Sequence, residues 1–159
     1  MTNETMTVTT PSDTAVRVQR DFDAPAQLVW DAHTKPELFK QWLLGPDGWE
    51  MPVCEMDVRV GGAYRCEWSD TTGHEPSFGV SGTFSVVEPI TRLVTVERMD
   101  GFDGESVNTY TFEERNGRTT LTLLMDFGSQ EARDGAMATG MADGVTVSYE
   151  RLASLLPTF

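Results

Sequence analysis

The sequence is poor in the residues that most often bind metals or act as nucleophiles and bases. Its 159 residues include two cysteines, Cys54 and Cys66, and two histidines, His33 and His74. The cysteines lie in no CxxC or other zinc-ligand spacing, and the histidines are far apart in the chain. Two cysteines also make no disulfide framework for a small secreted domain. These scarcities predict reduced thiols, a cytoplasmic location, no metal site and no cofactor.

A disulfide between the two cysteines is not expected either. If the pair Gly61 and Gly62 forms a tight hairpin turn, Cys66 pairs closer to Asp57 than to Cys54. The two thiols would then be out of register, and a bond between them would need distorted geometry.

Basic residues are scarce as well, and the sequence contains no long hydrophobic run. The 12 Lys and Arg against 25 Asp and Glu give a net charge of −13. Such a charge repels nucleic-acid phosphates and anionic membrane surfaces. No stretch approaches the roughly 18 consecutive apolar residues of a membrane span. We therefore expect neither nucleic acid nor a membrane as a partner. The acidity itself has two interpretations: it maintains solubility, or it attracts a basic protein partner.

The sequence does contain enough apolar residues for one core. Hydrophobic residues make up 39% and charged residues 23%, as in soluble globular proteins, and the length is typical of one domain. Residues 1–14 are polar and rich in Thr, and they lack the basic and apolar segments of a secretory signal. We expect a flexible tail over residues 1–14 and a single domain over 15–159, present as a monomer or homodimer.

Alternation of apolar and polar residues predicts seven strands. The pairs Gly61–Gly62 and Asn116–Gly117 are signals for hairpin turns. The predicted strands are residues 15–22, 53–60, 63–69, 78–87, 93–99, 106–113 and 119–127.

Two short helices are predicted after the first strand, and a long helix at the C-terminal end. The short helices start at Pro25 and near Pro36, because proline suits a first helical turn. Ser129 is the expected N-cap of the long helix, whose apolar residues recur every three or four positions up to Leu156. Glycines in its first half predict fraying or a kink. This order of elements indicates an α+β domain, in which a curved antiparallel sheet of about six or seven strands wraps the long helix and leaves a cleft.

Four stretches in this order carry a family resemblance. They are RDFDAPAQLVWDAHTKPELFKQW over residues 20–42, DVRVGGAYR over 57–65, GTFSVVEPITRLVTVE over 82–97, and GRTTLTL over 117–123 with the helix ending ERLASLL at 150–156. Together they resemble the START-like (SRPBCC, helix-grip) superfamily and, within it, the branch of the activator of heat-shock protein 90 ATPase. The resemblance implies the helix-grip fold over most of the chain. It also implies binding of molecules such as lipids, sterols, polyketides or plant hormones, with cyclisation or dehydration as rarer activities.

Aromatic and methionine side chains from successive elements are the candidate lining of the cleft. They offer apolar contact to a ligand, and the alternative for each one is that it only fills the core. The candidates are Trp42, Tyr64, Trp68, Phe84, Met99, Tyr110, Phe112, Met125, Met137 and Met141. Arg59 is a candidate polar anchor, with a structural pairing to Asp57 as the alternative.

No catalytic constellation is recognised in the sequence, so no catalytic residue is predicted. His33 is expected at a helix end or on the surface, and His74 in a solvated turn. Glu67 and Glu97 lie within strands and are expected on the outer face of the sheet. The alternative is that one of them faces the cleft as a general acid or base with a raised pKa.

Three functions follow as hypotheses. The leading one is binding of a small hydrophobic or aromatic molecule without a cofactor, oriented by Tyr64, Tyr110 or Arg59. The second is a protein-interaction module that meets a chaperone or another partner through its acidic surface. The third is a cyclase- or dehydratase-type enzyme acting on a polyketide-like substrate, which requires an ionisable side chain that points inward.

Overall fold

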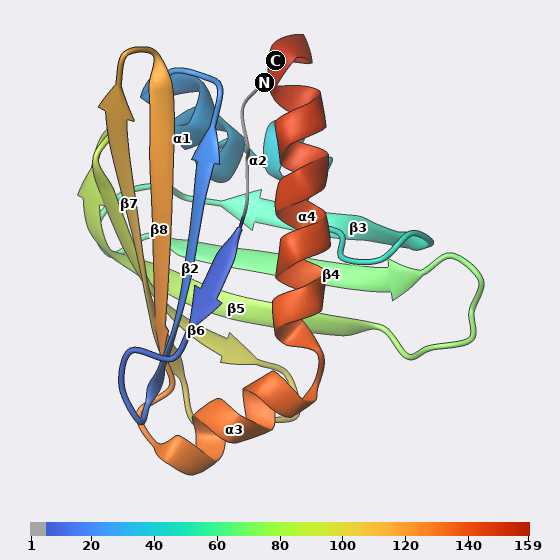
Figure 1. Ribbon diagram of the computed structural model, residues 1–159. Coiled ribbons are helices and arrows are strands. Elements are labelled where there is room, and N and C mark those ends of the chain that lie inside the picture. The colour runs from blue at the N-terminus through green and yellow to red at the C-terminus, as the bar shows by residue number, and fades with distance from the viewer. Residues whose placement is uncertain (1–5) are drawn as a thin grey trace.

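The computed structural model describes residues 6–159, which form one antiparallel sheet and four α-helices (Figure 1). The strands are β1 Thr7–Thr9, β2 Ala15–Phe22, β3 Trp49–Met56, β4 Ala63–Asp70, β5 Phe78–Glu88, β6 Arg92–Met99, β7 Ser106–Arg115 and β8 Arg118–Asp126. The helices are α1 Ala26–Thr34, α2 Pro36–Phe39, α3 Gln130–Ala138 and α4 Met141–Leu155, followed by a 3₁₀ turn at Leu156–Thr158.

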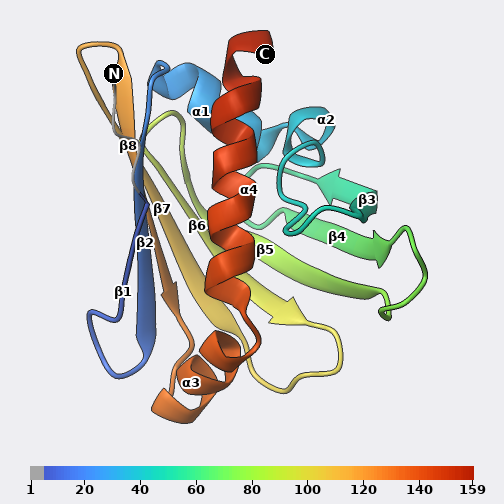
Figure 2. The same cartoon turned by 45° about the vertical axis from the view of Figure 1, so that its right-hand side comes forward.

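The sheet has the strand order β1-β2-β8-β7-β6-β5-β4-β3 and curves around α4. Figures 1 and 2 show that β3, β4 and β5 run across the direction of β2, β7 and β8. In the same views, α1 and α2 lie at one end of the sheet and α3 lies at the other. Helix α4 therefore spans the concave face, which is the helix-grip arrangement. Within residues 6–159, no helix has both the length and the apolar character needed to cross a bilayer.

The predicted α+β fold is confirmed, with one strand more than expected. β2 has the predicted bounds, and five of the other six predicted strands differ from the structure by no more than two residues at either end. The additional strand is β1, in which Val8 pairs with Val18 of β2. It lies within the segment predicted as a flexible tail, of which residues 1–5 are outside the described residues. Three residues are too few for their alternation to indicate a strand in the sequence.

The connection between β3 and β4 differs most from the prediction. β3 ends at Met56, and residues 57–62 form a loop in place of the expected two-residue turn. In this loop Gly61 has φ +84°, and a Cβ at Gly62 would lie 1.9 Å from the carbonyl oxygen of Asp57. The two glycines are thus required, as expected, but in a longer loop. The longer loop shifts the pairing of the strands, so that Cys54 lies directly opposite Cys66. The out-of-register arrangement that the sequence predicted for the two cysteines is therefore wrong.

The predicted long terminal helix is two helices. α3 begins at the expected N-cap, where the Ser129 hydroxyl accepts a hydrogen bond of 3.1 Å from the Ala132 N–H. Gly140, with φ +82°, separates α3 from α4. α3 contains no buried residue, whereas Tyr149 and Leu152 of α4 are buried in the core. The glycine-rich half of the predicted helix is therefore a separate, superficial element.

Candidate functional site

Six of the predicted cleft residues come together on the concave face of the sheet. They belong to the same hydrophobic core as Tyr149 and Leu152 of α4. These six are Tyr64 and Trp68 from β4, Phe84 from β5, Tyr110 and Phe112 from β7, and Met125 from β8. Tyr64 and Tyr110 are partly buried, and the other four are buried.

The remaining predicted residues occupy different surroundings. Trp42 is completely buried between α1 and α4, with its ring centroid 5.1 Å from that of Tyr149. Met137 and Met141 pack against the core from the junction of α3 and α4. Met99 is 42% exposed at the end of β6. Trp42 is thus a core residue, and the three methionines lie along the margin of the concave face.

Arg59, the predicted polar anchor, lies outside this group. It is in the loop between β3 and β4, its side chain is exposed, and its Nε donates a 2.8 Å hydrogen bond to Asp57. The structure therefore places Arg59 in the structural pair that the sequence offered as the alternative. It does not bring Arg59 together with the side chains of the concave face.

A polar cluster lies among the apolar side chains of the concave face. The Tyr64 hydroxyl donates a 2.8 Å hydrogen bond to Oε1 of Glu97, and the Asn108 side chain also hydrogen-bonds to Glu97. Thr95 lies opposite Asn108 in the pairing of β6 with β7. We call Tyr64, Thr95, Glu97 and Asn108 the Glu97 cluster. Glu97 was expected on the outer face of the sheet, so this expectation is corrected in favour of the inward-facing alternative.

The absence of a side chain at Gly82 makes the bond between Tyr64 and Glu97 possible. Gly82 pairs with Tyr64 of β4 on one side and with Glu97 of β6 on the other. A Cβ at Gly82 would lie 2.3 Å from the Tyr64 ring. The Tyr64 ring therefore lies over the backbone of β5 and reaches the carboxylate across that strand.

The electrostatics of the Glu97 cluster follow from its burial. Burial raises the pKa of the Glu97 carboxyl, and the hydrogen bonds from Tyr64 and Asn108 oppose that rise. Burial and then the Glu97 charge raise the pKa of the Tyr64 hydroxyl, and the same two causes act on Tyr110. Both tyrosine hydroxyls are thus neutral at pH 7. Glu97 is an inward-facing carboxyl that can accept a proton under milder acidity than an exposed one.

The cluster also contains hydrogen-bonding capacity that the protein does not use. Asn108 is 4% exposed, and its Oδ1 has no hydrogen-bond partner among the described residues. Thr95 is equally buried, and although its hydroxyl faces that of Tyr64, Oγ1 makes no hydrogen bond of ordinary geometry. A buried acceptor without a partner costs about 1–3 kcal/mol. Such a group on a concave face is suited to meet a donor from a bound molecule.

His33 forms a second buried polar site: it lies at the end of a helix, as expected, but the alternative of a surface position is wrong. It is 4% exposed in the last turn of α1, where its Nδ1–H donates a 2.7 Å hydrogen bond to the Val29 carbonyl. Nε2 then accepts from the Tyr149 hydroxyl at 3.1 Å. Burial lowers the pKa of His33 to about 4, so the ring is neutral at pH 7. We call His33, Trp42, Phe112 and Tyr149 the His33 cluster, in which the His33 ring contacts each of the other three rings.

These two clusters differ in the chemistry they allow. Both ring nitrogens of His33 are used in structural hydrogen bonds, so this side chain is not placed to act as a base. The hydrogen-bond partners of Glu97, Tyr64 and Asn108, are both neutral, and the carboxylate lies beside unused polar atoms. Among residues 6–159, no three His, Cys, Asp or Glu side chains are grouped so that they could hold a metal ion.

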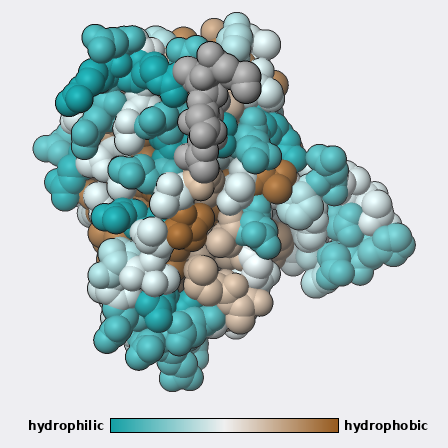
Figure 3. Space-filling view, in the orientation of Figure 1, coloured by the Kyte–Doolittle hydropathy of each residue, from teal (hydrophilic) through white to brown (hydrophobic). Residues whose placement is uncertain are grey.

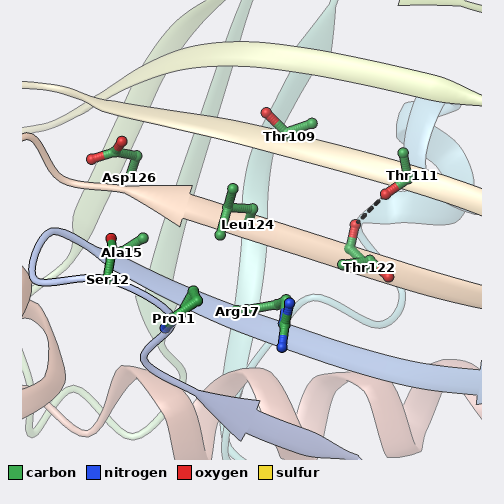
Figure 4. A pocket seen from close by; sticks show the side chains of 9 residues that line it. All are labelled: Pro11, Ser12, Ala15, Arg17, Thr109, Thr111, Thr122, Leu124 and Asp126. Atoms are coloured by element: carbon green, nitrogen blue, oxygen red, sulfur yellow. Dashed lines mark hydrogen bonds between the residues drawn. The ribbon is translucent and has the colours of Figure 1, made fainter.

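Hollows within residues 6–159 lie away from these two clusters. One, of about 400 Å³, lies on the outer face of the sheet, where Arg17, Thr109, Thr111 and Thr122 line it (Figure 4). Another, of about 380 Å³, lies between α2 and β3 and is lined by residues that include Cys54. None of the predicted cleft residues lines either hollow.

Comparisons with known proteins give a consistent result. Residues 23–157 match the family model described as "Activator of Hsp90 ATPase homolog 1-like protein". A crystal structure of a protein from Rhodobacter sphaeroides is 30% identical over 99% of this chain and 100% of that one, with a TM-score of 0.90. A protein from Nitrosomonas europaea, at 23% identity, shares the fold over 94% of this chain and 97% of its own, with a TM-score of 0.82. No curated protein matches the sequence.

Proposed function

Since the chain belongs to the family of Activator of Hsp90 ATPase homolog 1-like proteins, we propose that it binds a small, largely apolar molecule on the concave face of its sheet. The ligand lies between the sheet and α4, and it carries at least one hydrogen-bond donor. Asn108 accepts from that donor, while Tyr64 and Glu97 fix the orientation of the ligand. No cofactor takes part in this binding.

The observation that carries the proposal is the unpaired Oδ1 of Asn108. This atom is buried beside the Tyr64–Glu97 hydrogen bond and among apolar side chains. Ligand sites commonly combine an apolar lining with a few polar groups that fix orientation. A phenol or a similar hydroxyl compound would supply both the apolar surface and the missing donor.

Access to this face requires movement of an element that covers it. α3 contains no buried residue, and Gly140 joins it to α4 in a left-handed backbone conformation. Met137 and Met141 lie on either side of this joint and only partly contact the core. Because few contacts hold α3, its displacement is less costly than displacement of α4. The proposed route for the ligand therefore passes the junction of α3 and α4.

A matched series of ligands tests the proposal. Thermal unfolding and calorimetry are measured with aromatic phenols, flavonoids and polyketide-like compounds, each beside its methyl ether. We expect the phenols to raise Tm and to bind more tightly than their ethers. In Asn108→Leu the preference for the phenol should fall about 3–10-fold, the loss of one hydrogen bond. Thr111→Val on the outer face is the control and should keep the preference. The proposal fails if no compound binds, or if Asn108→Leu retains the same preference.

A second candidate function rests on the charge of the protein. The net charge is −13. Figure 3 shows hydrophilic surface over α3 and the projecting β4–β5 hairpin, and hydrophobic surface gathered near β1 and the adjoining part of α4. The name of the family refers to activation of the Hsp90 ATPase. Docking to a basic surface of such a chaperone would make its ATPase rate depend on this protein at low salt and less so at high salt. An ATPase rate that is unchanged by the protein at low salt contradicts this candidate.

A further inference from the structure

The two cysteines of the chain face each other across neighbouring strands. Cys54 of β3 lies directly opposite Cys66 of β4, and both are free thiols. Directly opposed residues of antiparallel strands have Cα atoms about 4.5–5.5 Å apart. This separation lies within the range of about 4.4–6.8 Å that disulfides span. The pair therefore needs little backbone movement to form a bond.

The strand that can shift to bring the two thiols together is β3, which within residues 6–159 has a neighbouring strand on one side only. β3 is the last strand in the order of the sheet, and its pairing with β4 is interrupted by a bulge between Glu50 and Val53. The 57–62 loop joins it to β4. An edge strand with a bulge can adjust its distance from its neighbour without disturbing a strand on its other side.

The two thiols have different surroundings. Cys66 is 1% exposed within the core, and its interaction with Cys54, together with burial, raises the pKa of its thiol. Cys54 is partly exposed and lines the 380 Å³ hollow between α2 and β3. The Cys66 thiol and then the Lys40 ammonium lower the pKa of Cys54, against opposing effects of burial and of Glu37. Cys54 is therefore the thiol that a reagent in the hollow meets and the one that ionises first.

We propose that Cys54 and Cys66 form a reversible dithiol–disulfide pair, in which Cys54 reacts first with a small disulfide in the hollow beside α2 and Cys66 then closes the bond. The product ties edge strand β3 covalently to β4, next to Tyr64 in the pairing of these strands. This modification site does not depend on the ligand proposed above.

The reaction balances with a small disulfide such as glutathione disulfide as the oxidant. The Cys54 thiolate, whose proton passes to solvent, attacks one sulfur of the oxidant. A mixed disulfide forms, and one glutathione thiolate leaves and takes up a proton. Cys66 then loses its proton and attacks the Cys54 sulfur, which forms the Cys54–Cys66 bond and releases the second glutathione. Two electrons pass from the cysteines to the oxidant, and excess reduced glutathione reverses both steps.

The test uses the folded full chain. The protein is incubated with glutathione disulfide without denaturant, and free thiols are then alkylated for mass spectrometry. We expect a monomer that carries no alkyl group, has lost about 2 Da relative to the reduced chain, and melts about 5–10 °C higher. Reduced glutathione should restore both thiols. A wild-type chain that keeps two free thiols, stops at the mixed disulfide or cross-links only between molecules overturns the proposal.

Variants test the order of the two steps. Cys66→Ala should accumulate the mixed disulfide at Cys54, and Cys54→Ala should leave Cys66 unmodified while the protein is folded. Lys40→Gln should slow the first step about 2–5-fold, because the thiolate loses a nearby cation. The matched control is Lys35→Gln, since Lys35 pairs with Asp31 at 3.6 Å and does not line the hollow. Equal rates for Lys40→Gln and Lys35→Gln, or modification of Cys66 in Cys54→Ala, contradict the assigned order. The wild-type result stands even if Cys66→Ala does not fold.

Discussion

The His33 cluster and the Glu97 cluster are both buried polar sites, but only one of them satisfies its own hydrogen bonds. In the His33 cluster, each ring nitrogen of His33 has a partner, and the rings of Trp42, Phe112 and Tyr149 pack around it. In the Glu97 cluster, Asn108 Oδ1 has no hydrogen-bond partner within residues 6–159, and burial raises the pKa of the Glu97 carboxyl. A satisfied polar site rigidifies a core, whereas an unsatisfied one retains capacity for another molecule. The first cluster therefore contributes to the stability of the core, whereas the second keeps hydrogen-bonding capacity that the protein itself does not use.

The largest effect is expected from removing the main packing element of the His33 cluster. Trp42 is fully buried, and its Nε1–H donates to the Ala32 carbonyl at 3.0 Å. Trp42→Ala should lower the free energy of unfolding by about 3–5 kcal/mol, because it leaves a cavity and an unpaired carbonyl. Urea unfolding at pH 7 measures this. The control is Phe102→Ala, at a side chain that is 66% exposed. This change should alter the free energy of unfolding by about 0.5 kcal/mol or less. A similar small change for Trp42→Ala would show that this cluster does not hold the core.

The pH dependence of stability separates the two clusters next. The pKa of His33 is 6.5 in the unfolded chain and about 4 in the folded protein. Between these values the unfolded chain binds the proton and the folded protein does not, so stability is present above pH 6.5 and is lost as pH falls toward 4. The loss from His33 is about 3 kcal/mol. Urea unfolding measures the free energy of unfolding at pH 7 and at pH 4. Its decrease between these pH values should be smaller by about 3 kcal/mol in His33→Gln than in the wild type. Equal slopes would mean that His33 is not buried as a neutral ring.

A methyl group at Gly82 tests the geometry of the Glu97 cluster. Gly82→Ala places a Cβ against the Tyr64 ring and should separate Tyr64 from Glu97. We expect a loss of about 1–3 kcal/mol in urea unfolding, which is typical of overpacking. The matched control is Gly135→Ala in α3, where a Cβ would meet nothing within 4 Å. That change should stabilise the protein by about 0.5–1 kcal/mol. If both variants behave alike, Tyr64 is not held as described.

The smallest effect is expected from the hydroxyl of Tyr64. Tyr64→Phe should cost about 0.5–1.5 kcal/mol and raise the pKa of Glu97 further, because a donor to the carboxylate is lost. With a folded pKa above 4.5, the folded protein holds this proton more tightly than the unfolded chain does. The contribution of Glu97 to the free energy of unfolding thus falls as pH rises from 4.5 through the folded pKa. NMR titration of the Glu97 carboxyl should give a higher midpoint in Tyr64→Phe than in the Thr111→Val control. An unchanged midpoint contradicts the hydrogen bond.

The sequence contains a signal for the burial of His33. Val29 and His33 are four residues apart on the apolar stripe of α1, so the histidine shares the buried face of that helix. The sequence pattern indicates the inward direction of the Glu97 side chain less clearly. It is in phase with Leu93 and Thr95, but Val94 and Val96 on the alternate face are equally apolar. Alternation therefore did not distinguish the two faces of β6.

The position of the cysteines could not be obtained from the sequence at all. Their pairing depends on the 57–62 loop, and the two glycines also suit a two-residue turn. The number of unpaired residues in the turn between two strands determines which of their side chains lie opposite each other. Loop length was settled by hydrogen bonds to β5, such as that from Gly61 N to the Phe84 carbonyl at 2.8 Å. These bonds join residues that are far apart in the chain.

By itself, the sequence determined the fold, because alternation, helical spacing and turn residues are local properties that agree along the whole chain. It also indicated, among ten candidates, the six aromatic and methionine side chains that come together on the concave face. Only the tertiary structure decided which polar atoms are buried without partners, that Tyr64 reaches Glu97 over Gly82, and that Cys54 faces Cys66. These relations depend on strand register and on the curvature of the sheet around α4, which arise from contacts between distant segments and leave no local pattern in the sequence.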